Sequence, residues 1–497
     1  MIPAAKAPDD PFLRVPINAE EVECRNRQLE EDDVLRIAAG AFDGQMRWSS
    51  CSTVHNVNQP VLLAAAAIHG VTSAYNPNVL WDLVSGHFRD YERAVVQHLA
   101  HLAGWGPQSA DGVSTFGGKA GLIYALKCGV NRVAPNASVD GIPNPAPVVL
   151  TSDETHYSVE SAAALLGMGT SCVRRIPTEQ GVMRPEELRS TLRAMHSSGE
   201  RVAAIVLGGG STLDGAIDPV AACIDVAEAE MGEDRPWLHV DLALGWPWLY
   251  FLDYDWLRDP LQLPSSVRPV LVKIAEQLRG VSRADSFGVD FHKLGFAPYS
   301  SAFFVCRDWA ALRSVFGSAD THREHDYGQN FAQHHTIEHS RSGEGILAAW
   351  TCLQLLGADG FRSYIAHLHA LTLRFRDLAG AAGFEIYNDG APSFATLLAP
   401  PAPDHISDAR QCDAFTEHVF MSAVGLGSAA QGTLALGYIP QYTRGAGSQR
   451  SVLRVYLCNP HLTEDRVAGL VDQLTRACQA ATQTFVMGDT HYTHTPR

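Results

Sequence analysis

Lys293 is the residue of this chain whose type and setting point most directly to chemistry. It follows His292 between two apolar, β-prone runs. A lysine between segments predicted to be buried strands is costly to desolvate unless it is paired, neutral or covalently used. A desolvated lysine with a lowered pKa is the usual nucleophile for Schiff-base chemistry. A lysine at a strand end that keeps its ammonium in water fits the same pattern, so this segment alone leaves both interpretations open.

Three further groups of chemically capable residues precede Lys293. Gly117-Gly118-Lys119 stands before a predicted helix, where backbone amides and the positive end of the helix can bind an anion such as phosphate. His156 follows a predicted strand, at the edge where open α/β sheets bind ligands. Asp241 ends another apolar strand, and a buried carboxylate needs a cationic or donor partner. Singly, each also fits a common structural role, namely a turn, a helix cap or a partner of an arginine.

Together these four groups supply what pyridoxal 5'-phosphate (PLP) requires from a protein. That cofactor needs a phosphate cup, a flat group to stack on its ring, an acid for its pyridinium nitrogen and a lysine for a Schiff base. The carboxylate keeps the ring protonated, so that it can accept the electron pair released at Cα. The combination therefore favours a PLP site over four unrelated structural residues.

The elements that would position these residues alternate between residues 110 and 310. Short β-branched runs are followed by helical stretches, which is typical of a mostly parallel sheet flanked by helices. Strands are predicted at 147–150, 172–176, 202–207, 237–240 and 302–305, and helices at 120–132, 159–166, 184–196 and 219–231. Other predicted helices are 20–40, 60–69, 81–104, 345–356 and 361–378, with later strands at 396–398, 433–438 and 452–457.

We therefore expect an α/β protein with three parts. These are an N-terminal arm and helical segment (1–75), a large α/β domain (76–343) that includes a polar, His-rich mobile loop (318–343), and a small α+β C-terminal domain (344–497).

Composition narrows the functional class. The 497 residues are 46% hydrophobic and 19% charged, and the formal net charge is −16, which disfavours nucleic acid and anionic membranes as partners. Ten cysteines without metal-ligand spacing, and an N-terminus without an apolar signal core, favour a cytoplasmic protein. The His-rich loop shows no clean ligand spacing, so we expect no metal site.

Several motifs, in the same order along the chain, resemble the group II PLP-dependent amino acid decarboxylases. This is the glutamate, aromatic amino acid and tyrosine decarboxylase group of the aspartate aminotransferase fold (fold type I). The resemblance runs from about Asn76 to Pro460. Its motifs are Phe116-Gly117-Gly118-Lys119-Ala120, His156-Tyr157-Ser158, the segment Ser211–Pro219, His239-Val240-Asp241-Leu242-Ala243, Asp285-Ser286 with His292-Lys293, and Leu453-Arg454-Val455 with Asn459-Pro460.

The resemblance implies a role for each matching residue in holding the cofactor. Lys293 would form the internal aldimine, His156 would stack on the ring, Asp241 would pair with the pyridine nitrogen and Ala243 would pack on the other face. The remaining cofactor-binding candidates are Gly117, Gly118, Lys119, Thr212, Ser286 and His292, with Ser300 and Ser301 as candidates to reach the neighbouring subunit's phosphate. Lys119 departs from the family, which has a small hydroxyl residue there. Either its ammonium or only its backbone amide would then meet the phosphate.

The same resemblance implies the reaction. We expect a homodimer that decarboxylates an L-amino acid to the amine and CO2 through an external aldimine and a quinonoid. Arg341 in Ser340-Arg341-Ser342 would bind the substrate α-carboxylate, although an arginine that caps a loop is the structural alternative. Tyr327, or a histidine of the same loop, would protonate Cα.

The fold alone does not fix the reaction. A PLP-dependent C–C lyase or aldolase, an aldehyde-forming oxidative decarboxylase and a catalytically inactive homologue remain alternatives. The sequence does not identify the amino acid.

Overall fold

The structure is a computed structural model that describes residues 10–13, 24, 28–80, 82–107, 109–310, 335–406, 408–425, 434–443 and 449–485. The chain forms two compact units, each described here by itself. One comprises Met1–Asn56, Leu371–Asp389 and Phe394–Arg497, and the other comprises Val57–Ala370 and Gly390–Ser393. The predicted three-part division of the chain stays a prediction.

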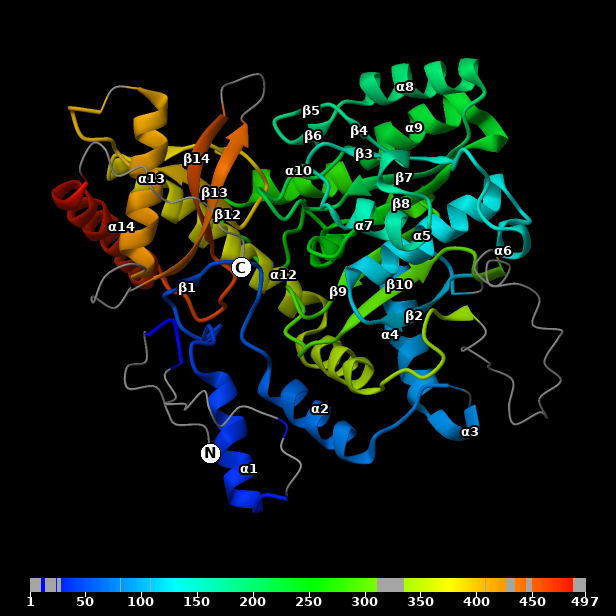
Figure 1. Ribbon diagram of the computed structural model, residues 1–497, viewed down its shortest axis with the longest axis horizontal. Coiled ribbons are helices and arrows are strands. Elements are labelled where there is room, and N and C mark those ends of the chain that lie inside the picture. The colour runs from blue at the N-terminus through cyan, green and yellow to red at the C-terminus, as the bar shows by residue number, and fades with distance from the viewer. Residues whose placement is uncertain are drawn as a thin grey trace. The chain divides into compact units, whose positions relative to one another are not determined.

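The larger unit is built on a seven-stranded sheet of order β2-β10-β9-β8-β7-β3-β4 (Figure 1). Its strands are β2 (Asp111–Thr115), β3 (Val148–Ser152), β4 (Val173–Ile176), β7 (Val202–Gly208), β8 (Trp237–Asp241), β9 (Ser286–Asp290) and β10 (Ala302–Cys306). Neighbours from β9 to β4 pair in parallel, whereas β10 is antiparallel to both β9 and β2. The prediction of an α/β fold with a mostly parallel sheet is confirmed.

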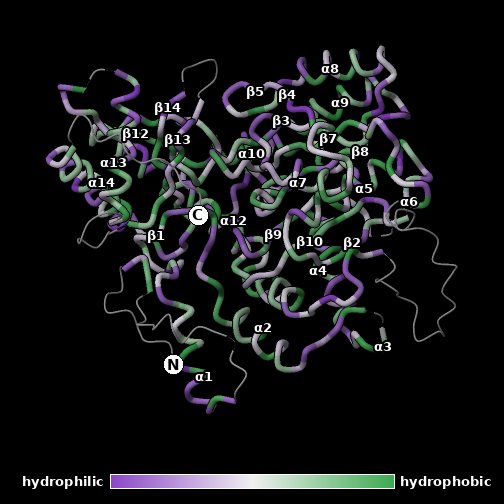
Figure 2. Tube along the Cα trace, in the orientation of Figure 1, coloured by the Kyte–Doolittle hydropathy of each residue, from purple (hydrophilic) through white to green (hydrophobic). Residues whose placement is uncertain are grey.

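Hydrophobic burial explains why these segments form the central strands. The side chains of Val202–Leu207 in β7 form a continuous apolar run and are buried (Figure 2). Such continuous apolar runs are typical of parallel strands covered on both faces. A small hairpin, β5 (Thr178–Glu179) with β6 (Val182–Met183), lies outside this sheet.

Helices connect these strands and pack against them. They are α2 (Leu63–Tyr75), α3 (Asp82–Ser85), α4 (Phe88–Leu102), α5 (Gly118–Val133), α6 (Ala137–Asp140), α7 (Ser158–Leu165), α8 (Pro185–Ser198), α9 (Val220–Met231) and α10 (Arg268–Leu278). Helix α5 packs across β7, β8, β9 and β10. Helix α8 has proline at its first position and is followed directly by Gly199, whose φ is 71°, in agreement with helix start and stop signals.

One helix prediction in this unit was wrong. A single helix was expected over 81–104, but α3 and α4 are separate, and Gly86 between them has φ 50°. A positive φ is readily adopted by glycine and breaks the right-handed helix at that point. The apolar periodicity did not reveal the break, because the residues that show it lie in α4, after the break.

The smaller unit has a five-stranded sheet of order β1-β13-β14-β12-β11. Its elements are α1 (Glu31–Ala39), β1 (Thr53–Val54), β11 (Glu385–Ile386), β12 (Ala395–Ala399), β13 (Ala435–Thr443), β14 (Gln449–Tyr456), α13 (Ala409–Val424) and α14 (Glu464–Thr484). Asp408 caps α13 by accepting from the Gln411 N–H at 2.8 Å. The predicted small α+β C-terminal domain is confirmed, although α13 and α14 were not predicted.

Helix α12 (Glu344–Ala381) contains both helices predicted at 345–356 and 361–378. Gly357 interrupts it with φ 59°, which agrees with the predicted gap between the two. Of the predicted loop 318–343, residues 318–334 lie outside the described residues, and 335–343 form turns with a bridge between Asn78 and Ser342. Among the helices of the described residues, none has the length and apolar character needed to cross a membrane.

Candidate active site

The predicted site residues gather at one edge of the seven-stranded sheet. His156 follows β3, Thr212 follows β7, Asp241 ends β8 and Lys293 follows β9. These four strands run in parallel, so their carboxyl ends meet at the same edge, where open α/β sheets bind ligands. Because β10 is antiparallel to both β2 and β9, β2 also ends there and leads into α5.

A cavity of 150 Å³ opens among these strand ends. The predicted residues that line it are Gly118, Lys119, His156, Thr212, Asp241, Ala243 and Lys293. Thr155, Ser158, Ser211 and Asp290 also line it, and none of them was predicted. Residues from five separate segments of the chain therefore surround one small space.

Lys293 lies against a carboxylate in this cavity. Its Nζ is 2.9 Å from Oδ2 of Asp290, which is the last residue of β9. Burial alone would lower the pKa of Lys293, but the Asp290 and Asp241 carboxylates outweigh burial and raise that pKa above its usual value. In this arrangement Lys293 is an ammonium paired within the protein.

Asp241 presents a second carboxylate to the same cavity. Its Oδ1 accepts a hydrogen bond from the backbone N–H of Ala243 at 3.1 Å. Desolvation raises the pKa of Asp241, opposed by the Lys293 charge and by that hydrogen bond. A carboxylate in this state gains stability when a further cation, such as a protonated ring nitrogen, enters the cavity.

His156 presents a neutral imidazole. Its Nδ1 accepts from the backbone N–H of Ser158 at 3.2 Å and lies 2.8 Å from the Ser158 hydroxyl. Burial lowers the pKa of His156 and the Lys293 charge lowers it further, against the opposing effect of Asp241. Because Nδ1 is an acceptor, the ring proton lies on Nε2.

The start of α5 forms a cradle that favours glycine. A Cβ on Gly118 would lie 3.1 Å from Oδ2 of Asp290 and 3.4 Å from Cβ of Ala243. Gly117, directly before α5, has φ 154°, which L side chains rarely adopt. Gly118 and Lys119, at the beginning of α5, line the cavity, and backbone amides at a helix start can bind a phosphate.

Four of the predicted cofactor-binding residues lie away from this cavity. Ser286 is buried in the core, where its hydroxyl bonds Trp237 Nε1 at 2.8 Å and His239 Nδ1 at 2.9 Å, so this placement gives its predicted role no support. His292 is buried and stacks on Tyr299 with ring centroids 4.0 Å apart. Ser300 and Ser301 line a second cavity, of 320 Å³, together with Ser114, Phe116 and Arg341. Tyr327 lies outside the described residues.

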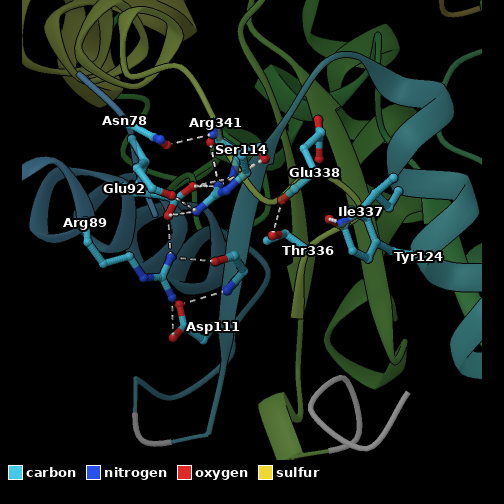
Figure 3. Close-up of polar contacts among 12 residues, drawn as sticks. Asn78, Arg89, Glu92, Asp111, Ser114, Tyr124, Thr336, Ile337, Glu338 and Arg341 are labelled. Atoms are coloured by element: carbon cyan, nitrogen blue, oxygen red, sulfur yellow. Dashed lines mark hydrogen bonds and ion pairs between the residues drawn. The ribbon is translucent and has the colours of Figure 1, made fainter. Parts of the chain in front are cut away.

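Arg341 is held in a buried ionic network, shown in Figure 3. Its Nη1 and Nη2 lie 2.5 Å and 3.2 Å from the two carboxylate oxygens of Glu92, and its side chain is 3% exposed. Nη1 also donates to the Ser114 hydroxyl at 2.9 Å. Because this fork is occupied by a protein carboxylate, the geometry favours the structural alternative over binding of a substrate carboxylate.

The network extends to a second arginine, and a separate hydrogen bond to Tyr124 holds the segment before Arg341. Arg89 bonds Glu92 at 2.5 Å and Asp111 at 3.1 Å, and the Tyr124 hydroxyl accepts from the Ile337 N–H at 2.7 Å. Burial raises the pKa of Glu92, but Arg341 and Arg89 outweigh burial and lower it to about 2. Two carboxylates thus pair with two buried guanidiniums, while the partly exposed Arg93 lies 3.6 Å from Asp111. These pairs hold Arg341 beside α4 and β2 (Figure 3).

The donor set of the 150 Å³ cavity fits PLP. A glycine cradle at a helix start, a neutral imidazole, a carboxylate without a cation of its own and a lysine face one space. Lys119 adds a cation at the cradle, where the phosphate would bind. Asp290 is the unexpected member. Its signal in the sequence was its position three residues before Lys293, at the end of a β-prone run.

Comparison with known proteins agrees with this fit. The family model described as "Pyridoxal-dependent decarboxylase conserved domain" matches residues 53–249 and 270–392. Cysteine sulfinic acid decarboxylase of Rattus norvegicus is 27% identical over 397 residues, covering 78% of this chain and 74% of the relative. L-2,4-diaminobutyrate decarboxylase of Rhizobium meliloti is 27% identical over 377 residues, covering 73% and 68%.

Among solved structures, mouse CSAD in apo form superposes with a TM-score of 0.78 at 22% identity, covering 93% of each chain. At this identity the likeness shows the fold, which is that of the PLP-dependent decarboxylases, as the sequence predicted. The family model spans more than half of the chain and includes every strand end that forms the cavity. The chain therefore belongs to the pyridoxal-dependent decarboxylase family, and its reaction is the PLP-dependent decarboxylation of an amino acid.

Proposed function

We propose that the 150 Å³ cavity is the catalytic site and that Lys293 carries the cofactor. The observation behind this proposal is that Lys293, Asp241, His156 and Gly118 line one cavity, although they come from four segments of the chain. Lys293 supplies the amine for the Schiff base, and Asp241 holds the proton on the pyridine nitrogen. His156 stacks on the ring, while Gly118 and Lys119 bind the phosphate.

When bound, PLP supplies an electron sink for the pair left at Cα after CO2 departs. The residues of the chain control where protons lie. Asp241 has its pKa raised by burial, so an entering ring nitrogen and this carboxyl share a proton within a partly buried site. The neutral His156 ring offers a flat surface without adding positive charge next to that nitrogen. Ala243, which lines the same cavity, would pack on the opposite face of the ring.

Tyr327 remains our proposed donor of the proton to Cα. A Tyr327→Phe variant keeps the ring and removes the hydroxyl. We expect kcat to fall roughly 10²-fold with little change in KM, since general acid catalysis contributes about this much. Steady-state kinetics on wild type and variant make the comparison, and unchanged kcat would move the role to another group.

We also propose that the protein is a homodimer. Helix α2 exposes a stripe of apolar residues at every fourth position, with Leu63 at 85% and Tyr75 at 83% exposure. Exposed apolar stripes of this kind favour burial against a partner. In the dimer, Ser300 and Ser301 would reach the phosphate of the other copy.

Light scattering after size exclusion tests the dimer. Leu63→Asp places a charge in the stripe and should shift the protein toward monomer. Ser73→Asp on the same helix lies off the stripe and serves as the control. Dimers that persist unchanged in Leu63→Asp would contradict the role of α2.

A substrate panel tests the reaction itself. The panel begins with cysteine sulfinate, aspartate, glutamate and L-2,4-diaminobutyrate, because relatives are named for acidic amino acids and for diaminobutyrate. Release of CO2 with an equal amount of amine supports simple decarboxylation. Ammonia and hydrogen peroxide would instead reveal an oxidative route, and a carbonyl product without CO2 would reveal C–C cleavage.

A further inference from the structure

Among the charged side chains next to Lys293 in the cofactor cavity, negative charges outnumber positive ones. Two carboxylates, Asp241 and Asp290, face one partly buried lysine, Lys293, whose side chain is 21% exposed. When a protonated ring nitrogen pairs with Asp241, Asp290 is left to pair with Lys293. Each of the two carboxylates then has a different cation as its partner.

We propose that Asp290 is the counter-ion that receives Lys293 when the amine of the substrate takes the place of Lys293 on the cofactor. The proposal rests on the assignment of Lys293 as the Schiff-base lysine. In that exchange one C=N bond breaks and another forms. The substrate ammonium arrives with three N–H bonds, and Lys293 leaves with three, so protons and charge balance on the two sides. Asp290 stabilises the leaving ammonium inside the protein.

The geometry of Asp290 suits this task. Its side chain is 4% exposed, and its Oδ2 lies 2.9 Å from Nζ of Lys293. Both residues belong to one tight turn, because the Lys293 N–H donates to the Asp290 carbonyl at 3.3 Å. Oδ1 of Asp290 is buried and has no hydrogen-bond partner among the described residues, so it can accept a second N–H of the ammonium.

Other groups around Lys293 do not offer an equivalent partner. His156 and His292 have lowered pKa values because they are buried, and both are neutral. Tyr299 has a pKa raised by burial and keeps its proton. Lys119 is a like charge on the wall of the cavity. Asp241 is the second carboxylate, but in the proposed site it pairs with the ring nitrogen of the cofactor.

This arrangement predicts that a change at Asp290 affects two rates in opposite directions, namely the joining of Lys293 to the cofactor and its release. Asp290 favours the free, protonated Lys293, so it opposes the joining of Lys293 to the cofactor and assists its release. Replacing Asp290 by Asn should lower the pKa of Lys293, speed joining and slow release. A residue that served only packing would, on replacement, slow both steps.

The experiment compares wild type with Asp290→Asn in the full-length protein. Joining is followed by absorbance when pyridoxal, which lacks the phosphate, is added to cofactor-free protein at several pH values. We expect joining at pH 7 to be about 10-fold faster in the variant, with its pH midpoint about one unit lower, as loss of one adjacent opposite charge predicts. Release is followed by mixing the holoenzyme with O-methylhydroxylamine, and we expect it to be about 10-fold slower.

Asp290→Glu, which keeps the charge, should restore both rates toward wild type. If Asp290→Asn does not fold, Asp290→Ser replaces it in the same comparison. Rates that are unchanged, or both slower, would overturn the role of Asp290. Lys293→Ala separates this failure from a wrong assignment of the lysine, because a visible band that survives in Lys293→Ala places the cofactor on another residue.

Discussion

Two buried groups of charges in the larger unit differ in how they are balanced. In the network of Glu92, Arg341, Arg89 and Asp111, carboxylates and guanidiniums match within the protein. In the cavity, Asp241 and Asp290 share one partly buried lysine, and one oxygen of Asp290 has no partner among the described residues. The matched network fixes structure, whereas the unmatched cavity leaves room for a ligand that brings its own charges. An imbalance of buried charge therefore marks the site better than buried charge itself.

Removing the lysine should break the cavity most severely. In Lys293→Ala we expect activity to fall on the order of 10⁴-fold or more, since nucleophile and cofactor anchor are lost together. The visible absorbance of the bound cofactor should disappear while far-UV circular dichroism stays unchanged. Lys127→Ala, on α5, controls for the loss of a lysine elsewhere.

Removing one partner of the balanced network should cost stability rather than chemistry. Glu92→Gln leaves the buried Arg341 charge without its carboxylate, at a cost of about 3–5 kcal/mol in the free energy of unfolding. Denaturant unfolding measures this cost. Remaining activity per folded molecule should change little, and a selective loss of activity would show that Arg341 serves the substrate after all.

The same network predicts how stability depends on pH. The folded pKa of Glu92, about 2, is depressed below the unfolded value, so its contribution is present above pH ~4.5. That contribution is lost as pH falls from ~4.5 through 2. The free energy of unfolding of wild type should therefore fall steeply as pH is lowered through this window, and that of Glu92→Gln should fall less. Equal slopes would contradict the ionic role of Glu92.

Replacing Asp241 changes the cavity without removing its lysine. Asp241→Asn keeps the shape and loses the charge that holds the ring proton, so kcat should fall roughly 10²–10³-fold with the cofactor still bound. A shift in the visible spectrum should accompany this loss. Wild-type kcat in Asp241→Asn would show that another group protonates the ring.

The smallest effect is expected at the edge of the cavity. Lys119→Ser removes a single, partly solvated charge from the cradle, so we expect affinity for PLP to weaken about 10-fold. Affinity for pyridoxal, which lacks the phosphate, should stay the same. Equal weakening for both ligands would mean that Lys119 shapes the cradle instead of binding the phosphate.

The sequence predicted most strands and helices of the larger unit, and the residues that line its cavity, because both follow from local sequence patterns. Strand ends carry the motifs of His156, Asp241 and Lys293, and the parallel sheet brings strand ends together without further information. Motifs that follow successive parallel strands in the sequence therefore lie close together at one edge of the sheet. That is why a set of individually weak motifs was informative.

The sequence could not predict partners that are distant along the chain. Arg341 meets Glu92 across 249 residues, and no local pattern indicates that this pairing would occupy a guanidinium expected to bind substrate. Ser286 lies in a motif but points to Trp237 and His239 in the core. Asp290 was overlooked because a carboxylate at a strand end commonly caps a turn, and only its distance from Lys293 gives it another meaning.

The most direct measurement locates the cofactor on the chain. The chain contains five lysines, namely Lys6, Lys119, Lys127, Lys273 and Lys293. Borohydride reduction of the holoenzyme makes the lysine–cofactor bond permanent, and peptide mass spectrometry then identifies the modified residue. We expect the added mass on Lys293 alone, in one copy per chain. Modification at Lys119 or at any other lysine would contradict the assignment of the catalytic site.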